Sequence, residues 1–248
     1  DKYAGTLTDI GGYSLNYHKH IHTGEGGVLV TNDDNLCQRM QLIRNHAEAI
    51  VDAKKITKLN NMIGHNFRLG EIECAIGVEQ LKKLDKLVNT RILAAEKLTK
   101  GIQNLTGIST PVTKENCTHV YYMYPIKLDL SLIKVPRDKI VDALEAEGLS
   151  GLSKGYTNIH MLPMYQKKIA YGSNSFPWSL SDRKIDYGPG TCKTAEILHN
   201  KLLIGFEMCL YELNDYEIDK ISPEKVPDTN TSSSFFIILL FPTKAANG

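Results

Sequence analysis

The sequence of 248 residues lacks a strong excess of charge of either sign and lacks a long hydrophobic run. Because the formal net charge is only +1, we expect neither a nucleic-acid partner nor association with a membrane surface. The longest apolar run, FFIILLF at 235–241, is far shorter than the about 20 residues that cross a membrane. Residues 1–12 have neither a basic region nor an apolar core, so we expect no signal peptide there.

Cysteine is scarce as well, and the five cysteines are widely spaced and never form C-x-x-C. An odd number in this arrangement argues against a disulfide framework or a zinc knuckle and indicates free thiols. We therefore expect a cytoplasmic protein. The remaining composition is that of a globular chain, long enough for one large domain or two ordinary ones.

The first part of the chain has an α/β pattern. Segments 9–16 and 26–33 each contain a short apolar run between turn residues, which predicts two buried strands. A helix is expected next, capped by Asn32 or Asp33 and continuing to about His46.

Two amphipathic helices are expected within 69–87 and 88–105, because apolar residues recur there at intervals of three and four. The pattern then changes. Alternating apolar residues predict a strand at 119–129. Pro136 marks the first turn of a helix, with Ile140, Val141 and Leu144 along one side. A further strand is expected at 202–208.

These elements predict two domains with a boundary near residue 88. Residues 1–88 are expected to be the remainder of a large sheet-containing domain, and 89–221 a smaller α+β domain that ends in a helix capped by Asn214. Residues 222–248 have turn and linker composition around an isolated apolar heptamer. We interpret them as a tail, either packed or disordered, or as a cloning or reading-frame artefact.

The most informative stretch is YHKHIHTGEGG at 17–27, in which His18, His20 and His22 surround Lys19. Histidines at i, i+2 and i+4 share one face of an extended strand and could hold a metal ion. A non-catalytic metal-binding module is therefore one interpretation. The other, which we favour, is a turn that holds the lysine, with glycines that let the backbone approach a ligand.

Lys19 has a setting suited to carbonyl chemistry. It lies between the two predicted strands, and Ser14 ends the first of them, where its hydroxyl can reach an anion. A lysine that is partly desolvated has a lowered pKa and becomes a nucleophile toward carbonyls. The following TGEGG matches neither the dinucleotide-binding nor the P-loop pattern, so we expect no nucleotide loop.

The stretch YSLNYHKHIHTGEGGVLVTND resembles the cofactor-lysine segment of the sugar aminotransferases of the DegT/StrS type. Ser14, Lys19 and the GEGG turn stand at the offsets usual in that family, with Leu15 in place of an aromatic residue.

Two further blocks carry the same resemblance. GHNFRLGEIECAIG at 64–77 is similar to the family's G-x-N-[YF]-R-[ML] block. GTCKTAEILHNKLLIGFEM at 190–208 is similar to its G-x-C-P-x-A-E block, with Lys193 in place of proline. The resemblance covers residues 1 to about 221.

The resemblance implies the C-terminal part of a fold-type-I transferase that depends on pyridoxal 5'-phosphate, with residues 1–88 in the large cofactor-binding domain. It implies that Lys19 forms the internal aldimine and moves a proton, and that Ser14 binds the cofactor phosphate. Asn66 would reach the phosphate bound by the neighbouring subunit, which makes a homodimer part of the site.

The resemblance also implies the substrates, a nucleotide-linked keto-sugar and glutamate as amino donor. His18 and His20 either line the sugar pocket or simply pack beside the lysine, and His160 lies in a segment similar to one near the family's sugar site. A sugar dehydratase of the same family is the alternative, although histidine replaces the lysine in that branch. The family's N-terminal portion has no match here, so we expect a fragment that is inactive alone.

Overall fold

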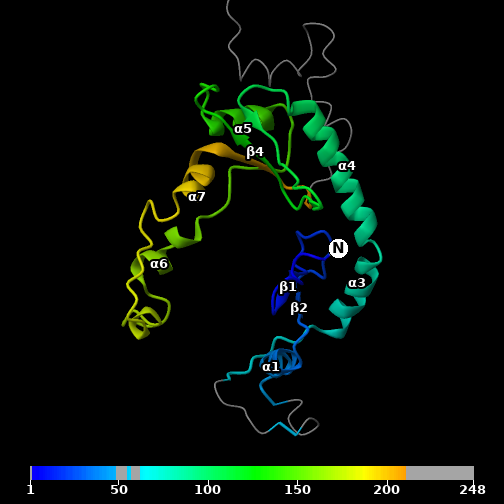
Figure 1. The fold of residues 1–248 in the computed structure, drawn as a ribbon, viewed down its shortest axis with the longest axis vertical. Coiled ribbons are helices and arrows are strands. Elements are labelled where there is room, and N and C mark those ends of the chain that lie inside the picture. Colours follow the sequence, from blue (N-terminus) through cyan, green and yellow to red (C-terminus); the bar gives the residue numbers. More distant parts are fainter. Residues whose placement is uncertain (1, 49–54, 57–61, 211–248) are drawn as a thin grey trace, which may run out of the picture. The chain divides into compact units, whose positions relative to one another are not determined.

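The computed structural model describes residues 2–48, 55–56 and 62–210 (Figure 1). The described residues contain both helices and strands, as the predicted α/β class requires. The described residues fall into two compact units, which meet in sequence between Val88 and Asn89.

In the first unit, β1 (Gly11–Ser14) pairs antiparallel with β2 (Gly27–Val30), both drawn in blue in Figure 1. The predicted strands are therefore present, but the prediction that they are buried is wrong. Val28 is 43% exposed and Leu29 is 61% exposed. Within the described residues, these two strands form a sheet of their own, and Val28 and Leu29 are not covered by a further layer.

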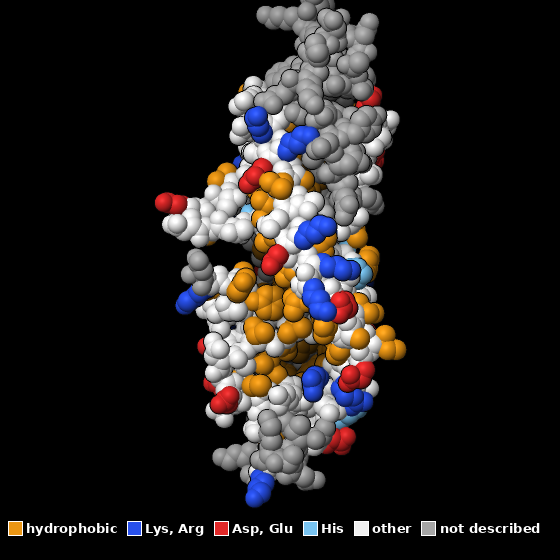
Figure 2. Space-filling view, turned by 90° about the vertical axis from the view of Figure 1, so that its right-hand side faces the viewer, with side chains coloured by type: hydrophobic (Ala, Val, Ile, Leu, Met, Phe, Trp, Pro, Cys, Tyr) orange, Lys and Arg blue, Asp and Glu red, His pale blue; other side chains and the backbone are white. Residues whose placement is uncertain are grey.

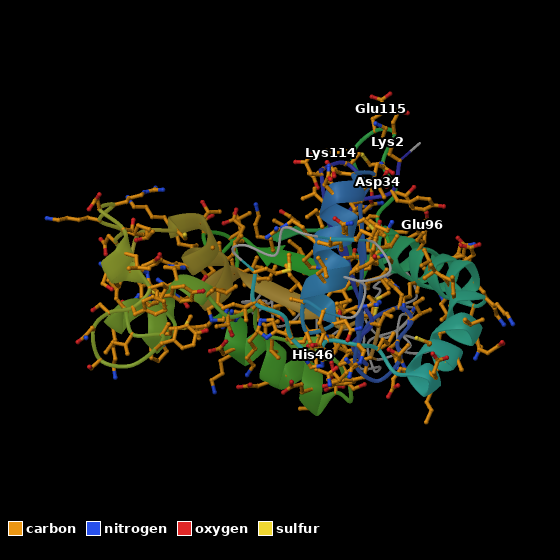
Figure 3. The ribbon with its side chains drawn as sticks, turned by 90° about the horizontal axis from the view of Figure 1, so that it is seen from below. Lys2, Asp34, His46, Glu96, Lys114 and Glu115 are labelled. Carbon is orange, nitrogen blue, oxygen red and sulfur yellow. The ribbon has the colours of Figure 1, made fainter. Side chains whose placement is uncertain are left out.

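The first helix, α1 (Asp34–Arg44), begins where the sequence predicts. The side chain of Asp33 accepts hydrogen bonds from the N–H groups at the second and third helical positions, at 2.8 and 3.0 Å. Asp33, not Asn32, is thus the N-cap residue. Figure 3 labels Asp34, the first residue of this helix, and His46, which follows the helix after Asn45.

The second helix of this unit, α3 (Glu71–Leu81), is present but is not amphipathic as predicted. None of its residues is buried, and Ile72, Ile76 and Leu81 are 75%, 42% and 61% exposed. Figure 2 shows hydrophobic side chains gathered on the side of the molecule where α3 lies.

In the second unit, four strands form an antiparallel sheet in the order β3-β4-β6-β5. Their bounds are Ile108–Ser109 for β3, Tyr124–Leu128 for β4, Leu152–Ser153 for β5 and Leu203–Phe206 for β6. Strands β4 and β6 lie within the two predicted strands. Central strand β4 pairs with β3 on one side and with β6 on the other.

Helices α4 (Leu84–Ile102) and α5 (Arg137–Ala146) supply apolar side chains to the core of this unit. The apolar side predicted for α5 is buried, whereas the stripe predicted for α4 is buried only in part, because Val88 and Ile92 are half-buried. The buried residues of both helices form one cluster with side chains of β4 and β6. The members from the helices are Ala95, Leu98, Ile102, Ile140, Val141 and Leu144.

Tyr124 on β4 places a polar group inside this core. Its side chain is fully buried, and its hydroxyl lies 2.7 Å from Oγ1 of Thr99 on α4. Burial raises the pKa of Tyr124 to about 12, although the hydrogen bond to Thr99 acts in the opposite direction.

Short elements complete the second unit: η1 (Ile159–Met161), α6 (Pro163–Lys167), η2 (Trp178–Leu180), α7 (Lys193–Ile197) and the π-helical turn η3 (Leu198–Leu202). The helix predicted after Asn214 and the tail 222–248 lie outside the described residues. In the described ranges, no helix is both long enough and apolar enough to cross a membrane.

Candidate active site

Lys19 lies in a series of turns and bends that connects β1 to β2. Its backbone N–H donates to the carbonyl of Asn16 at 3.0 Å, and its side chain is half-buried. Because this segment is not extended, His18, His20 and His22 do not share a strand face. The geometry required by the metal-binding interpretation is therefore not formed, and the described residues contain no cluster of three or more metal-ligating side chains.

Hydrogen bonds close the base of this loop. Leu15 donates its N–H to the carbonyl of Gly26 at 2.9 Å and accepts from the N–H of Thr23 at 3.0 Å. The amide of Asn16 donates to the Glu25 carboxylate at 2.6 Å, and the hydroxyl of Thr23 donates to the Glu25 carbonyl at 2.8 Å. The GEGG turn therefore holds the lysine loop in a defined shape.

Glycines let other segments come close to the buried Thr23 at the centre of the loop. A Cβ on Gly26 would lie 2.8 Å from Oγ1 of Thr23 and 3.1 Å from Cδ1 of Leu69. A Cβ on Gly77 of α3 would lie 3.2 Å from Cγ2 of Thr23. The lysine motif and the block at 64–77 are thus packed against each other.

Ser14 is the last residue of β1 and pairs with Gly27. Its side-chain oxygen accepts a hydrogen bond from the backbone N–H of Asn16 at 3.2 Å. A hydroxyl that accepts one hydrogen bond still has its own proton to donate, and Ser14 is exposed. It can therefore donate to an anion such as a phosphate.

Asn66 lies on an extended segment that forms a β-bridge with Asn45, just after α1. The backbone N–H of Phe67 donates to the carbonyl of Arg44 at 2.9 Å, and the guanidinium of Arg68 donates to the side chain of Asn45. The backbone at Asn66 is thus anchored while its side chain is exposed. Ser14, Lys19 and Asn66 all belong to the first unit.

Of the histidine candidates, His18 and His20 are half-buried beside the lysine, whereas His160 belongs to the second unit. Nε2 of His160 lies 3.0 Å from Oε1 of Glu196, which sequence reasoning did not select. The N–H groups of Gly190 and Cys192, and then the bond from His160, hold the pKa of the Glu196 carboxyl below its usual value. Glu196 lies in the block at 190–208 that resembles the family, and this resemblance was the only signal in the sequence that could have pointed to it.

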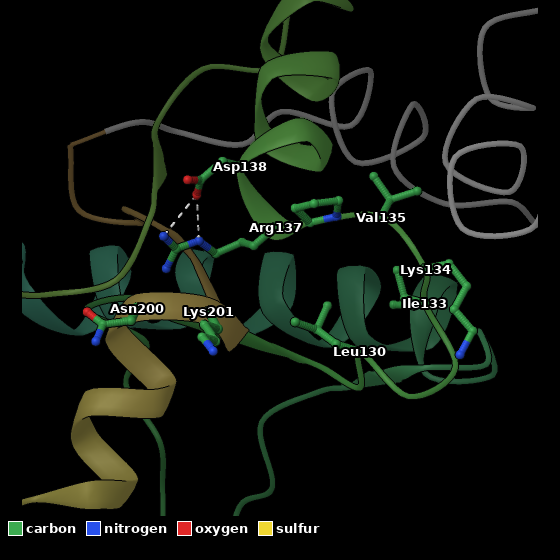
Figure 4. A pocket seen from close by; sticks show the side chains of 9 residues that line it. Leu130, Ile133, Lys134, Val135, Arg137, Asp138, Asn200 and Lys201 are labelled. Atoms are coloured by element: carbon green, nitrogen blue, oxygen red, sulfur yellow. Dashed lines mark hydrogen bonds and ion pairs between the residues drawn. The ribbon is translucent and has the colours of Figure 1, made fainter. Parts of the chain in front are cut away.

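A cavity of about 380 Å³ opens elsewhere in the second unit, at the start of α5 (Figure 4). Its apolar wall includes Leu130 and Ile133, and Lys134 and Lys201 contribute positive charge. The buried guanidinium of Arg137 is paired with Asp138 and donates to two backbone carbonyls. None of the predicted site residues lines this cavity.

The described residues thus have a mixed α/β fold, and a glycine-rich turn closes the loop that carries Lys19. The comparison with protein families agrees, because residues 1–184 match the DegT/DnrJ/EryC1/StrS aminotransferase family. The chain belongs to this family, as the resemblance predicted.

Among curated relatives, the GDP-perosamine synthase of Vibrio cholerae is 31% identical over 199 residues, which cover 77% of this chain and 51% of that protein. The chain spans about half the length of the curated relatives it matches.

Solved structures of similar fold include Helicobacter pylori PseC, an aminotransferase involved in the biosynthesis of pseudoaminic acid. It is 25% identical, with a TM-score of 0.64 over 89% of this chain and 53% of that one. The E. coli GDP-4-keto-6-deoxy-D-mannose-3-dehydratase, solved with bound hydrated pyridoxal phosphate, shares the fold at 24% identity. Its TM-score is 0.63 over 88% of this chain and 55% of that one. These solved structures of similar fold agree with the predicted α/β class.

Proposed function

We propose that the chain is part of an aminotransferase that depends on pyridoxal phosphate and transfers an amino group from glutamate to a nucleotide-linked keto-sugar. The observation that carries the proposal is Lys19, half-buried in a closed turn between β1 and β2 in a chain of this family. The names of two relatives, a GDP-perosamine synthase and a GDP-linked keto-sugar dehydratase, favour a nucleotide-linked sugar as substrate.

The residues of the first unit fit the chemistry of pyridoxal phosphate. Lys19 offers an amine that can attach to the cofactor aldehyde and carry a proton to and from the substrate. Ser14 offers a hydroxyl that can donate to the phosphate. The bound cofactor would supply an electron sink at the reacting carbon, while the protein supplies position and protonation.

The proposal includes a homodimer in a cytoplasmic setting. Asn66, anchored by its backbone and exposed at its side chain, would reach the phosphate bound by the neighbouring subunit. Residues 1–88 would belong to the large cofactor-binding domain and 89–221 to the small domain, with His18, His20 and His160 as candidate contacts to the sugar. The five cysteines are all free thiols, which supports a reducing compartment.

The fold alone does not separate amination from dehydration, because one structure of similar fold is a sugar dehydratase. Lys19 favours the aminotransferase, since the resemblance associates the dehydratases with histidine at this position. Incubation of the full-length parent enzyme with a keto-sugar nucleotide and glutamate should yield an amino sugar. A deoxy-sugar product would instead support the dehydratase.

Covalent labelling tests the role of Lys19. The chain is incubated with pyridoxal phosphate, reduced with borohydride and digested, and the modified peptide is identified by mass spectrometry. We expect the label on Lys19 and its loss in Lys19→Ala, while Lys2→Ala, a change at an exposed lysine, keeps it. Unchanged labelling of Lys19→Ala would refute the assignment.

A further inference from the structure

His160 and Glu196 form a hydrogen-bonded pair that joins two distant segments of the second unit. Nε2 of His160 on η1 lies 3.0 Å from Oε1 of Glu196 on α7, across 36 positions of sequence. Only 12% of the His160 side chain and 16% of the Glu196 side chain are exposed. Water therefore competes little for this contact.

Backbone groups hold the Glu196 carboxylate in place. The N–H of Gly190 lies 3.0 Å from Oε1 and 2.8 Å from Oε2, and the N–H of Cys192 lies 3.0 Å from Oε1. These backbone N–H donors favour the ionised form of the Glu196 carboxyl. An ionised carboxylate can only accept hydrogen bonds. The hydrogen between the two side chains must therefore belong to Nε2 of His160.

The backbone of His160 is held independently of Glu196. The side-chain amide of Gln166 donates to the carbonyl of His160 at 2.7 Å and also to the carbonyl of Tyr187. The main chain at His160 is therefore tied to two neighbouring segments, and the bond to Glu196 sets the orientation of the ring.

We propose that Glu196 is a positioning residue that keeps the proton of neutral His160 on Nε2. Neutral imidazole has one protonated and one unprotonated nitrogen, so the lone pair is then on Nδ1. A ligand group that contacts Nδ1 of His160 must therefore be a hydrogen-bond donor, such as a hydroxyl of a sugar. The identity of the ligand as a sugar rests on the proposed function, whereas the position of the proton does not.

Nitrogen NMR on the chain labelled with ¹⁵N-histidine tests the position of the proton at a pH where the imidazoles are neutral. The resonances of His160 are assigned by their loss in His160→Asn. We expect the wild type to show protonated Nε2 and unprotonated Nδ1. The reverse pattern, or an even mixture, would overturn the proposal.

Two variants separate positioning from a purely structural contact. Glu196→Ala removes the acceptor, so the two tautomers of His160 should mix. Glu196→Gln keeps an acceptor oxygen in the same place, so it should largely restore the Nε2–H form, and it serves as the readout if the alanine variant does not fold. Glu207→Gln, at another glutamate of the second unit, should leave His160 unchanged. An unchanged His160 spectrum in folded Glu196→Ala would contradict the proposal.

A titration with GDP-mannose, used as a nucleotide-linked sugar probe, tests whether Nδ1 of His160 contacts a sugar. The Nδ1 resonance of His160 should shift in the wild type and shift less in Glu196→Ala. If the Nδ1 resonance of wild-type His160 stays constant up to a saturating concentration of GDP-mannose, the proposed contact between His160 and a sugar is contradicted. None of these NMR measurements involves Lys19 or the cofactor. They can therefore fail while labelling of Lys19 succeeds, and they can succeed while the labelling fails.

Discussion

A Cβ atom on Gly26 would lie only 2.8 Å from Oγ1 of Thr23, a distance that real Cβ contacts essentially never show. The same Cβ would approach Leu69, which leads into α3. The absence of a side chain at Gly26 therefore lets the lysine loop close over Thr23 and pack against the segment that carries Asn66.

Gly26→Ala should open this loop. The φ of +154° at Gly26 disfavours other residues, and the added methyl group overpacks against Thr23, so we expect a loss of roughly 2–4 kcal/mol in local stability. Hydrogen–deuterium exchange of the loop amides measures it, since the N–H groups of Leu15 and Thr23 are bonded across the loop.

Gly24→Ala is the matched control for this change. Gly24 also has a positive φ, of +85°, but nothing lies within 4 Å of its added Cβ. Only the backbone cost of about 1–2 kcal/mol is expected. Equal effects of the two substitutions would show that the close packing at Gly26 is unimportant.

Asp33→Ala should destabilise α1 by about 0.5–2 kcal/mol, because it removes the acceptor for two backbone N–H groups. Urea unfolding followed by circular dichroism measures the loss. Asn32→Ala, at the neighbouring position that the sequence also offered as a cap, should change stability little. A larger effect at Asn32 than at Asp33 would contradict the observed cap.

The contribution of Glu196 to stability should depend on pH. Its pKa is lower in the folded protein than in the unfolded chain, so its contribution is complete above the unfolded value of about 4.3 and is lost as the pH falls through the folded value. Wild type should exceed Glu196→Gln in stability at neutral pH, and the difference should shrink in acid. A difference that grows in acid would contradict this sign.

Tyr124→Phe should show the opposite pH dependence. Removing the hydroxyl breaks the bond to Thr99, which costs about 0.5–1.5 kcal/mol at neutral pH. The pKa of Tyr124, raised to about 12, means that its contribution is complete below the unfolded value of about 10 and is lost at higher pH. The wild type should therefore lose its advantage over Tyr124→Phe in alkali, as urea unfolding between neutral and alkaline pH will show.

Thr99→Val is the control for the pH effect at Tyr124. It removes the same hydrogen bond but keeps the buried phenol, so stability should fall at neutral pH and fall further in alkali. If Thr99→Val showed no alkaline loss, burial of Tyr124 would not be the cause of the raised pKa.

Local signals in the sequence were enough for several elements. Asp33 caps α1, Pro136 precedes α5, and the apolar residues of α5 are buried as their spacing predicted. The glycine-rich turn after Lys19 was likewise recognisable. Caps, turns and periodicity depend on neighbouring residues, so they can be identified without knowledge of the fold.

Burial could not be predicted in the same way. The sequence predicted a buried strand around Val28 and an amphipathic helix with one apolar face at α3, yet the apolar residues of both are exposed in the described part of the chain. An apolar run shows that a segment can be buried, whereas its exposure depends on which other layers pack against it.

The sequence by itself determined the family, the turn that holds Lys19 and the start of α1, because each depends on residues that are close together in the chain. Only the tertiary structure decided that Leu69 packs at Gly26 and that Glu196 meets His160. These contacts join segments far apart in sequence, and their geometry depends on how the intervening backbone folds.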